Sequence, residues 1–269
     1  MTHHRVGRLN ITANDGEETT LRKTGKVIEL ERPRRLFVET WALKTARGRG
    51  LNVPVVLDYS RDEEGHETFA MERIQGVGLN EVQDEAVLAD CMFQVGEQLA
   101  ALKNVSSGFG WVNPDTELGT YESWSEFLVE YAIIYATGLV EEGLLEASLE
   151  QKLVEQLRAE NLDLATPMLV HRDIKWGNLV LDKTGKVFLI DWENAMLGDS
   201  LYDVAIFGVR EGHGLPWSEL ARGLGIDASS KKYALYEAVA LVGITEYHRK
   251  YETNAHIKAA QLKELIEML

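Results

Sequence analysis

The sequence predicts an α+β chain of two unequal lobes, a small β-rich lobe followed by a larger, mainly helical lobe. Residues 5–75 contain short runs typical of strands, with one helical stretch among them. From residue 80 apolar residues recur at helical spacing, and a short β-rich stretch at Met168–Ile190 interrupts the helices. We expect an N-terminal lobe over residues 1–75 and a C-terminal lobe over residues 77–269, with the boundary near Gln75–Gly78.

The first lobe should open with a β-hairpin. Asn14-Asp15-Gly16 is a turn signal between two short runs, Leu9–Ala13 and Thr19–Lys23. A helix should follow Pro33 and reach about Ala46, because glycines come next and stop it. Further strands are expected at Lys26–Leu30, Val53–Tyr59 and Thr68–Ile74.

Long helices should make up most of the second lobe. One apolar face recurs at three- and four-residue steps and consists of Val87, Leu88, Cys91, Met92, Val95, Leu99 and Leu102. Helices are also expected at residues 122–142 and 146–160, and again from Leu201 onward.

The composition favours a reducing compartment. Cys91 is the single cysteine of the chain, so no internal disulfide can form. Met1–Arg5 carry no apolar run. We therefore expect a cytoplasmic protein without a signal peptide and without a membrane-spanning segment.

Negative charge is concentrated in one part of the chain. The formal net charge is −15, and residues 81–160 hold 3 basic and 16 acidic residues, a net charge of −13. Such a surface repels nucleic acid and anionic membranes, so neither is expected as a partner. It would attract a cationic ligand, although a set of solvated helix faces is the alternative interpretation. The sequence carries no signal for an oligomeric state.

The segment His171–Glu193 carries the most informative pattern. Two apolar strands flank a turn; Asn178 precedes the first strand and Asp191 ends the second. A hairpin of this length brings both side chains to one edge, where their oxygens suit Mg²⁺ and phosphate. Asp173 lies five residues before Asn178 and can face a reacting hydroxyl across the metal site. Phosphoryl transfer needs this layout, although each residue alone also fits an ordinary turn.

This pattern resembles the protein-kinase-like superfamily, in which H-x-D-x-x-x-x-N is followed by a metal-binding Asp. The resemblance implies a two-lobed kinase-like fold, Asp173 as the catalytic base, and Asn178 and Asp191 as Mg²⁺ ligands. The run from His171 to Lys175 is similar to the catalytic loop of protein serine/threonine kinases. By that likeness Lys175 contacts the transferred phosphoryl group.

Two branches of the superfamily differ in the residues that come after Asp191. Trp192-Glu193 takes the place of Phe-Gly, and Asp203 follows Asp191 by only twelve positions, too few for an activation segment. The run Gly198-Asp199-x-x-Tyr202-Asp203 resembles the aminoglycoside-phosphotransferase and choline-kinase branch, above all the hygromycin-type antibiotic kinases. In that branch Asp203 opens a helix and braces the catalytic loop.

The resemblance also implies a nucleotide site in the first lobe. Phe69–Gly76 is similar to the family hinge, where the backbone of Glu72 and Ile74 would bind adenine. A Lys–Glu pair should grip the α- and β-phosphates, and Lys23 with Glu39 are the expected pair. Arg22 and Lys26 remain rivals of Lys23. No G-x-G-x-x-G motif precedes them, which favours the small-molecule branch.

We therefore expect a Mg²⁺-dependent O-phosphotransferase that moves the γ-phosphate of ATP or GTP to a hydroxyl of a cationic small molecule, such as an aminoglycoside. The acceptor should enter between residues 108–160 and the C-terminal helices. Two alternatives stay open. One is a protein serine/threonine kinase, favoured by Lys175. The other is a nucleotide-binding pseudokinase that acts as an interaction module.

Overall fold

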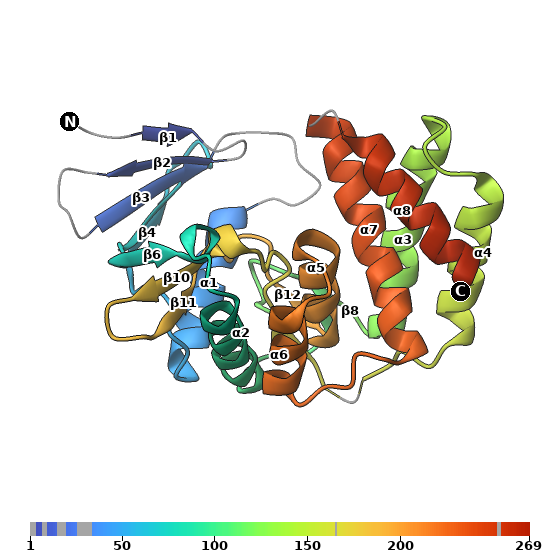
Figure 1. Cartoon of the computed structure of the whole chain (residues 1–269). Helices are drawn as coiled ribbons and strands as arrows, with labels where there is room; N and C mark the ends of the chain where they lie inside the picture. The colour runs from blue at the N-terminus through green and yellow to red at the C-terminus, as the bar shows by residue number, and fades with distance from the viewer. Residues whose placement is uncertain (1–3, 7–9, 15–19, 26–33, 165, 252–253) are drawn as a thin grey trace.

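The computed structural model describes residues 4–6, 10–14, 20–25, 34–164, 166–251 and 254–269. A small antiparallel sheet lies at one end of the molecule and a helical lobe fills the rest, as predicted (Figure 1). The five-stranded sheet has the order β1-β2-β3-β5-β4. Its strands are β1 (His4–Val6), β2 (Asn10–Asn14), β3 (Thr20–Gly25), β4 (Val56–Arg61) and β5 (Glu67–Glu72).

The two predicted N-terminal strands pair, since β2 and β3 are antiparallel with Asn14 opposite Leu21. Asp15 and Gly16 of the predicted turn lie outside the described residues. Helix α1 (Arg35–Gly48) contacts β3, β4 and β5 and buries Leu36, Trp41 and Leu43. The expected strand at Lys26–Leu30 lies outside the described residues.

Two further small sheets lie in the second lobe. In the first, β6 (Gly76–Gly78) pairs with β10 (Leu179–Asp182), which pairs with β11 (Val187–Leu189). The second has the order β8-β7-β12-β9, with β8 Gly119–Tyr121, β7 Phe109–Val112, β12 Met196–Gly198 and β9 Met168–Val170. Because β6 joins a sheet of the second lobe, this pairing supports the boundary that we propose near Gln75–Gly78.

Helices form the remainder of the second lobe. They are α2 (Glu85–Ala100), α3 (Trp124–Glu141), α4 (Ala147–Ala159), α5 (Leu201–Glu211), α6 (Leu215–Leu224), α7 (Lys231–Tyr251) and α8 (Ala255–Met268), with 3-10 turns η1 (Leu79–Glu81) and η2 (Trp176–Asn178). Local capping begins two of them: Asp84 accepts backbone N–H groups at the start of α2, and Ser123 does so at the start of α3. No helix in the described ranges has the length and apolarity needed to cross a bilayer.

Two buried hydrogen bonds join α3, α7 and the residue Asp199, which lies between β12 and α5. Trp124 Nε1 of α3 donates to the Tyr236 hydroxyl of α7 at 2.7 Å, and that hydroxyl donates to Asp199 Oδ2 at 3.0 Å. Both aromatic rings are fully buried and also pack edge-on against Tyr202 of α5. Satisfied hydrogen bonds of this kind orient a core without the cost of an unpaired polar group.

Candidate active site

Asp203 holds the backbone of the loop that precedes η2. Its two carboxylate oxygens accept the backbone N–H groups of His171 at 2.9 Å and Arg172 at 2.7 Å. The side chain is fully buried in the first turn of α5. Burial raises the pKa of Asp203 to about 7, and the two N–H donors oppose that rise. Helix α5 therefore fixes the loop directly.

His171 fixes the same loop from its side chain. Its Nδ1 accepts the backbone N–H of Asp173 at 3.1 Å, so its Nε2 carries the proton and donates to the Ile190 carbonyl oxygen at 3.0 Å. Trp192 covers the ring edge-on, with the ring centroids 4.5 Å apart. Burial lowers the pKa of His171 to about 4, so the ring is neutral at pH 7. His171 thus ties the loop of Asp173 to the strand that leads to Asp191.

Three side chains contact the carboxylate of Asp173. Lys175 Nζ lies 2.7 Å from its Oδ2, and Asn178 Nδ2 donates to the same oxygen at 3.0 Å. Arg210 Nη2 lies 2.9 Å from its Oδ1. The residue is 5% exposed. The carboxylate therefore lies at a fixed position between two cations and an amide.

The hairpin of β10 and β11 brings Asn178 and Asp191 to one edge. Leu179 pairs with Leu189, and Ile190 N donates to the Asn178 carbonyl oxygen at 3.0 Å. Asp191 follows with a left-handed backbone, φ 67°. This strained conformation turns its carboxylate toward the first lobe, where Lys23 Nζ lies 2.6 Å away.

Lys23 of β3 lies between two carboxylates. Its ammonium donates to Glu39 Oε1 at 2.8 Å and to Glu39 Oε2 at 2.9 Å, in addition to Asp191. Burial lowers the pKa of Lys23, but the carboxylates of Glu39 and Asp191 outweigh burial and hold that pKa above its ordinary value. Lys23 is therefore charged. Of its sequence rivals, Lys26 lies outside the described residues.

Carboxylate oxygens gather where a divalent ion would be expected. Oxygens of Glu39, Asp191 and Glu193 lie within 4.8 Å of one another. Burial and the Asp191 charge raise the pKa of Glu193, while Lys23 opposes this effect. Such hard oxygen donors, with the nearby Asn178 amide, fit Mg²⁺ and phosphate oxygens. Glu193 was not singled out from the sequence, although it stands two residues after Asp191.

Glu72 and Ile74 lie where the sheet gives way to the second lobe. Glu72 ends β5, its N–H donates to the Val55 carbonyl oxygen at 2.8 Å, and its carboxylate accepts Val55 N–H at 3.1 Å. Ile74 lies between β5 and β6 and is half-buried. Their predicted contact with adenine stays a prediction.

Arg210 was not identified from the sequence. It stands in the last turn of α5, seven residues after Asp203, and both contact the loop of Asp173. A seven-residue step returns to the same helix face, so this spacing was the available signal. The next residue, Glu211, accepts the backbone N–H of Trp176 at 3.1 Å. Trp176 itself packs edge-on against Phe207, with centroids 4.9 Å apart.

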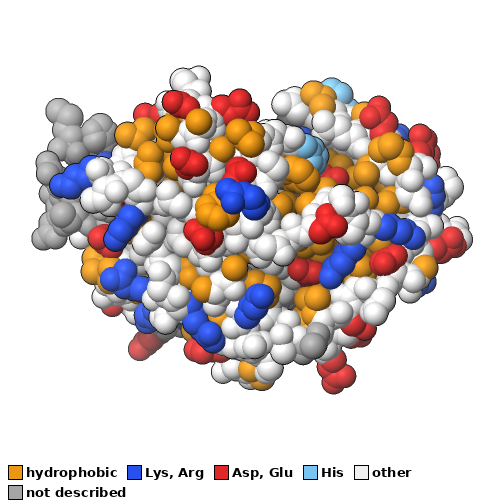
Figure 2. Space-filling view, turned by 60° about the horizontal axis from the view of Figure 1, so that its bottom comes forward, with side chains coloured by type: hydrophobic (Ala, Val, Ile, Leu, Met, Phe, Trp, Pro, Cys, Tyr) orange, Lys and Arg blue, Asp and Glu red, His pale blue; other side chains and the backbone are white. Residues whose placement is uncertain are grey.

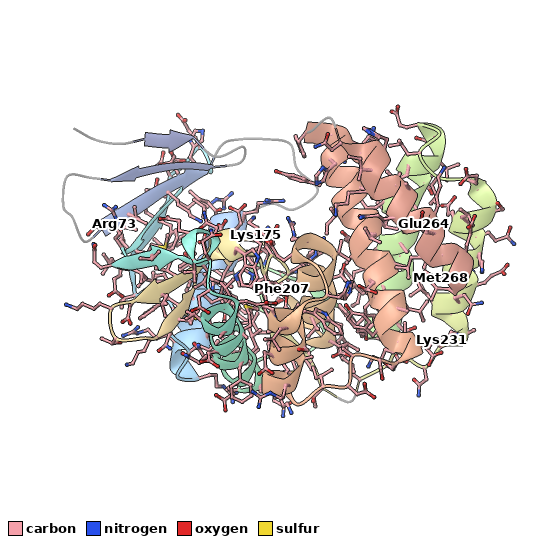
Figure 3. All side chains as sticks on the ribbon, viewed as in Figure 1. Arg73, Lys175, Phe207, Lys231, Glu264 and Met268 are labelled. Atoms are coloured by element: carbon pink, nitrogen blue, oxygen red, sulfur yellow. The ribbon has the colours of Figure 1, made fainter. Side chains whose placement is uncertain are left out.

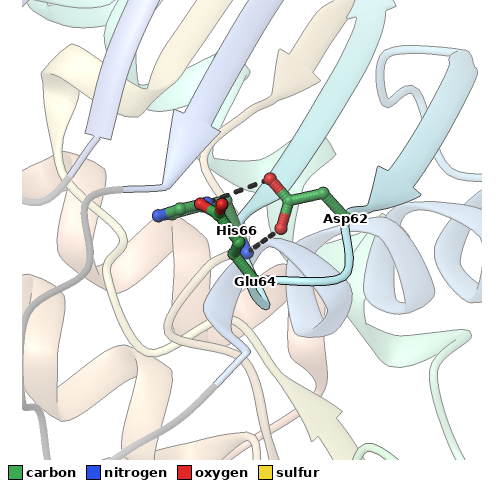
Figure 4. Close-up of side chains that lie close together, drawn as sticks. All are labelled: Asp62, Glu64 and His66. Atoms are coloured by element: carbon green, nitrogen blue, oxygen red, sulfur yellow. Dashed lines mark hydrogen bonds and ion pairs between the residues drawn. The ribbon is translucent and has the colours of Figure 1, made fainter.

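Another group of candidate metal ligands lies on the hairpin between β4 and β5 (Figure 4). Asp62 Oδ1 accepts the backbone N–H of His66 at 2.8 Å, and Asp62 Oδ2 lies 2.9 Å from His66 Nδ1. These contacts, with the exposed Glu64 nearby, close a tight turn. The group therefore has a local structural role.

A small sheet lobe, a larger helical lobe and the Lys23–Asp191 ion pair between them define a chain of the protein-kinase-like class. The model of the phosphotransferase enzyme family (APH) matches residues 22–241. The chain belongs to that family. Hygromycin-B 4-O-kinase of Escherichia coli is 33% identical over 161 residues, which cover 58% of this chain and 47% of the relative. The matched part thus spans about half the length of that curated relative.

Solved structures agree on the fold. The crystal structure of aminoglycoside phosphotransferase APH(4)-Ia is similar with a TM-score of 0.75 at 20% identity and covers 100% of this chain and 92% of that one. For a thermostable mutant of it in complex with ADP and hygromycin B, the TM-score is 0.76 at 20% identity, and the match covers 100% of this chain and 92% of that one. For a putative fructosamine-3-kinase from Haemophilus somnus, the TM-score is 0.67 at 17% identity, and the match covers 100% of this chain and 90% of that one.

Proposed function

We propose that the chain transfers the γ-phosphoryl group of ATP or GTP to a hydroxyl of a small molecule that carries amino groups, an aminoglycoside-type acceptor. The observation that carries this proposal is the meeting of Asp173, Asn178 and Asp191 with Lys23 at the junction of the two lobes. Family membership supports the reaction, and the hygromycin-B 4-O-kinase relative supports the acceptor class.

The nucleotide would be held from the first lobe. Lys23, charged and fixed by Glu39, is placed to bind the α- and β-phosphates. The backbone of Glu72 and Ile74 would bind the adenine or guanine edge, which leaves the choice between ATP and GTP to backbone contacts. Lys175 at the junction would then bind the γ-phosphate as a point charge (Figure 3).

Asp173 would accept the proton of the acceptor hydroxyl. As the O–H bond breaks, the oxygen forms a bond to the γ-phosphorus, and the bond from that phosphorus to the β–γ bridging oxygen breaks. The leaving electron pair stays on the nucleoside diphosphate. Asp203 and His171 keep the loop of Asp173 in place during this exchange.

Asn178 and Asp191 are the residues proposed to hold Mg²⁺, with Glu193 close enough to assist. A bound Mg²⁺ would neutralise charge on the phosphate oxygens. These residues contribute oxygen donors at the edge of the β10–β11 hairpin, next to Lys23 and Asp173.

The course of the chain after Asp191 favours the small-molecule branch over a protein kinase. Met196–Gly198 form the buried strand β12, paired on both sides with β7 and β9. Asp203 then opens α5. No exposed activation segment for docking a peptide fits between these described elements. The intact trio of Asp173, Asn178 and Asp191 argues likewise against a pseudokinase module.

The charge of residues 81–160 supports an acceptor that carries amines, because Glu126 and Glu130 of α3 and others give this block its net charge of −13. Figure 2 shows basic and acidic side chains intermingled on one face of the molecule. We propose that the enzyme works in the cytoplasm, where nucleoside triphosphates are abundant and thiols such as that of Cys91 stay reduced.

The test is a transfer assay with γ-labelled ATP and GTP, Mg²⁺ and an acceptor panel of hygromycin B, other aminoglycosides, choline-like amines, neutral sugars and a generic protein substrate. We expect label on an aminoglycoside-type acceptor and none on protein. Label on protein alone would favour the protein-kinase alternative. Nucleotide binding without transfer to any acceptor would favour the interaction module.

A further inference from the structure

Arg35 links the first lobe to the cluster of carboxylates proposed for the metal. Its Nη1 lies 3.4 Å from Glu193 Oε1, and the two side chains are 14% and 11% exposed. Arg35 is the first residue of α1 and stands one turn before Glu39, so both side chains lie on the same face of the helix. Oxygens of Glu39, Asp191 and Glu193 lie within 4.8 Å of one another. The Arg35 guanidinium therefore lies beside a group of oxygens that comes from both lobes.

The position of Arg35 in α1 points to a role in this cluster and not in the helix itself. The helix dipole disfavours a cation at the N-terminus, and the first turn of α1 has no acidic side chain to offset it. The neighbouring Arg34 pairs with a different residue of the second lobe, Asp115, at 2.8 Å. Among the described residues, Glu193 supplies the charged partner of the Arg35 guanidinium.

Each carboxylate of the cluster is paired with a cation of the chain itself. Lys23 Nζ lies 2.8 Å from Glu39 Oε1 and 2.6 Å from Asp191 Oδ1. Arg35 pairs with the third carboxylate, that of Glu193. The two cations offset most of the negative charge of the three carboxylates. A divalent ion at these oxygens must therefore compete with Lys23 and Arg35 for them.

The repulsion between Arg35 and a divalent ion is substantial. Mg²⁺ binds a carboxylate oxygen at about 2.1 Å, so an ion on Glu193 would lie no further than roughly 8 Å from Arg35 Nη1. At that distance a monovalent cation lowers the affinity for a divalent one about 6-fold at the dielectric constant of water. The effect is larger in a partly buried site, where salt screens charges less. Arg35 therefore weakens the binding of a metal ion that arrives alone.

A nucleotide triphosphate changes this balance. Its phosphate oxygens add negative charge beside the same carboxylates, and Mg²⁺ in proteins is commonly bound by one or two carboxylates together with substrate phosphates. An ion that arrives with the nucleotide is therefore attracted in spite of the Arg35 charge.

We propose that Arg35 is a positioning residue that makes metal binding depend on the nucleotide, because it pairs with Glu193 and so keeps lone divalent ions from the cluster of Glu39, Asp191 and Glu193. This inference rests on the proposed function, since it concerns the same metal site. Arg35 acts through Glu193. A chain that lacks the Arg35 charge should bind a divalent ion without nucleotide.

The experiment uses Mn²⁺ as the probe for Mg²⁺ and measures its dissociation constant from the nucleotide-free protein by the EPR signal of free Mn²⁺. Arg35→Gln and Arg35→Met should each bind Mn²⁺ about 10-fold more tightly than the wild type, whereas Arg35→Lys should stay close to the wild type. A misfolded chain does not produce such a gain. Adding Glu193→Gln to Arg35→Gln should remove the gain, because the carboxylate that Arg35 covers is then gone.

Arg34→Gln is the matched control, because Arg34 is the adjacent residue and also makes an ion pair between the lobes, but with Asp115. Its Mn²⁺ affinity should equal that of the wild type. Calorimetry with Mn²⁺-saturated AMP-PNP should give every Arg35 variant a nucleotide affinity within about threefold of the wild type.

Two results would overturn the inference alone: Arg35→Gln and Arg35→Met that bind Mn²⁺ no more tightly than the wild type, or an equal gain in Arg34→Gln. A wild type that binds neither Mn²⁺ nor Mn²⁺-saturated AMP-PNP overturns the proposed function, and the inference with it.

Discussion

Lys23 Nζ lies 2.6 Å from Asp191 Oδ1, across 168 positions of the sequence. One partner is on the sheet of the first lobe and the other comes after β11 of the second. Burial works to raise the pKa of Asp191, but the Lys23 ammonium outweighs burial and lowers it. This contact joins the proposed phosphate-binding residue to the proposed metal ligand, so a substitution at Lys23 should affect both nucleotide binding and the fold.

Lys23→Met should raise the nucleotide KM about 10-fold and lower kcat by roughly 10², since the ammonium group proposed to bind the phosphates is lost. It should also destabilise the fold by roughly 3 kcal/mol, because Glu39 is left buried without its partner. Steady-state kinetics and urea unfolding measure the two effects. In the double variant with Glu39→Leu the stability should recover and the activity should not. Recovery of both would show that Lys23 acts only in folding.

Asp191→Asn should raise the Mg²⁺ concentration needed for half-maximal rate by at least about 10-fold, because the proposed carboxylate ligand becomes neutral. Asn tolerates the left-handed backbone at this position, φ 67°, so the loop should keep its shape. A Mg²⁺ titration of the rate measures the change. An unaltered titration curve would place the metal elsewhere.

His171 should make stability depend on pH. Its folded pKa is about 4 against an ordinary value of 6.5, so below pH 6.5 the unfolded chain binds a proton that the folded chain does not. Stability from this group is therefore complete above pH 6.5 and lost as the pH falls toward 4, by about 3 kcal/mol in all. The raised pKa of Asp203 has the opposite effect, because it makes the fold more stable as the pH falls. The contribution of His171 is therefore measured as a difference between the wild type and a variant.

The difference is taken against His171→Gln, whose amide can replace both ring hydrogen bonds and does not titrate. Urea unfolding at about pH 5 and pH 7 should show the wild type losing more stability than the variant on acidification. Equal losses in both chains would mean that His171 is not held neutral.

Gly243 of α7 allows Tyr131 to approach, and Tyr131 in turn holds Arg172. A Cβ at position 243 would overlap the Tyr131 hydroxyl. That hydroxyl accepts from Arg172 Nη2, and the guanidinium lies 4.6 Å from the Trp111 ring centroid. Gly243→Ala should therefore cost roughly 1–3 kcal/mol and reduce kcat.

The matched control is Gly48→Ala in α1, where an added Cβ meets nothing within 4 Å. It should be neutral or stabilise by up to about 1 kcal/mol, as alanine does in helices. Thermal unfolding of the two variants separates them. A Gly243→Ala chain as stable as wild type would mean that Tyr131 can move aside freely.

The sequence was most informative for the site residues that lie close together along the chain. Asp173, Asn178 and Asp191 lie within one loop and hairpin, so their spacing alone predicts that they meet. Lys23 and Glu39 come from separate elements, and the choice of Lys23 drew on the family resemblance. The structure brings all five together. Their catalytic roles stay predictions for the variants above.

The sequence was least informative where contacts depend on how helices and strands pack. Arg210 reaches Asp173 only because α5 docks on the loop of residues 171–175. Strands β7 and β8 interrupt a stretch where mostly helices were expected, and Gly108 and Gly110 have positive φ there. Strand β6 carries one apolar residue, Val77, so periodicity gives no signal for its pairing with β10.

The most direct test of Asp173 as the base is the rate at which Asp173→Asn transfers the labelled γ-phosphate to the best acceptor of the panel, at saturating nucleotide and Mg²⁺. We predict a kcat lower than that of the wild type by roughly 10²–10⁴, with nucleotide affinity unchanged. A variant that transfers phosphate at the wild-type rate would contradict the proposed mechanism.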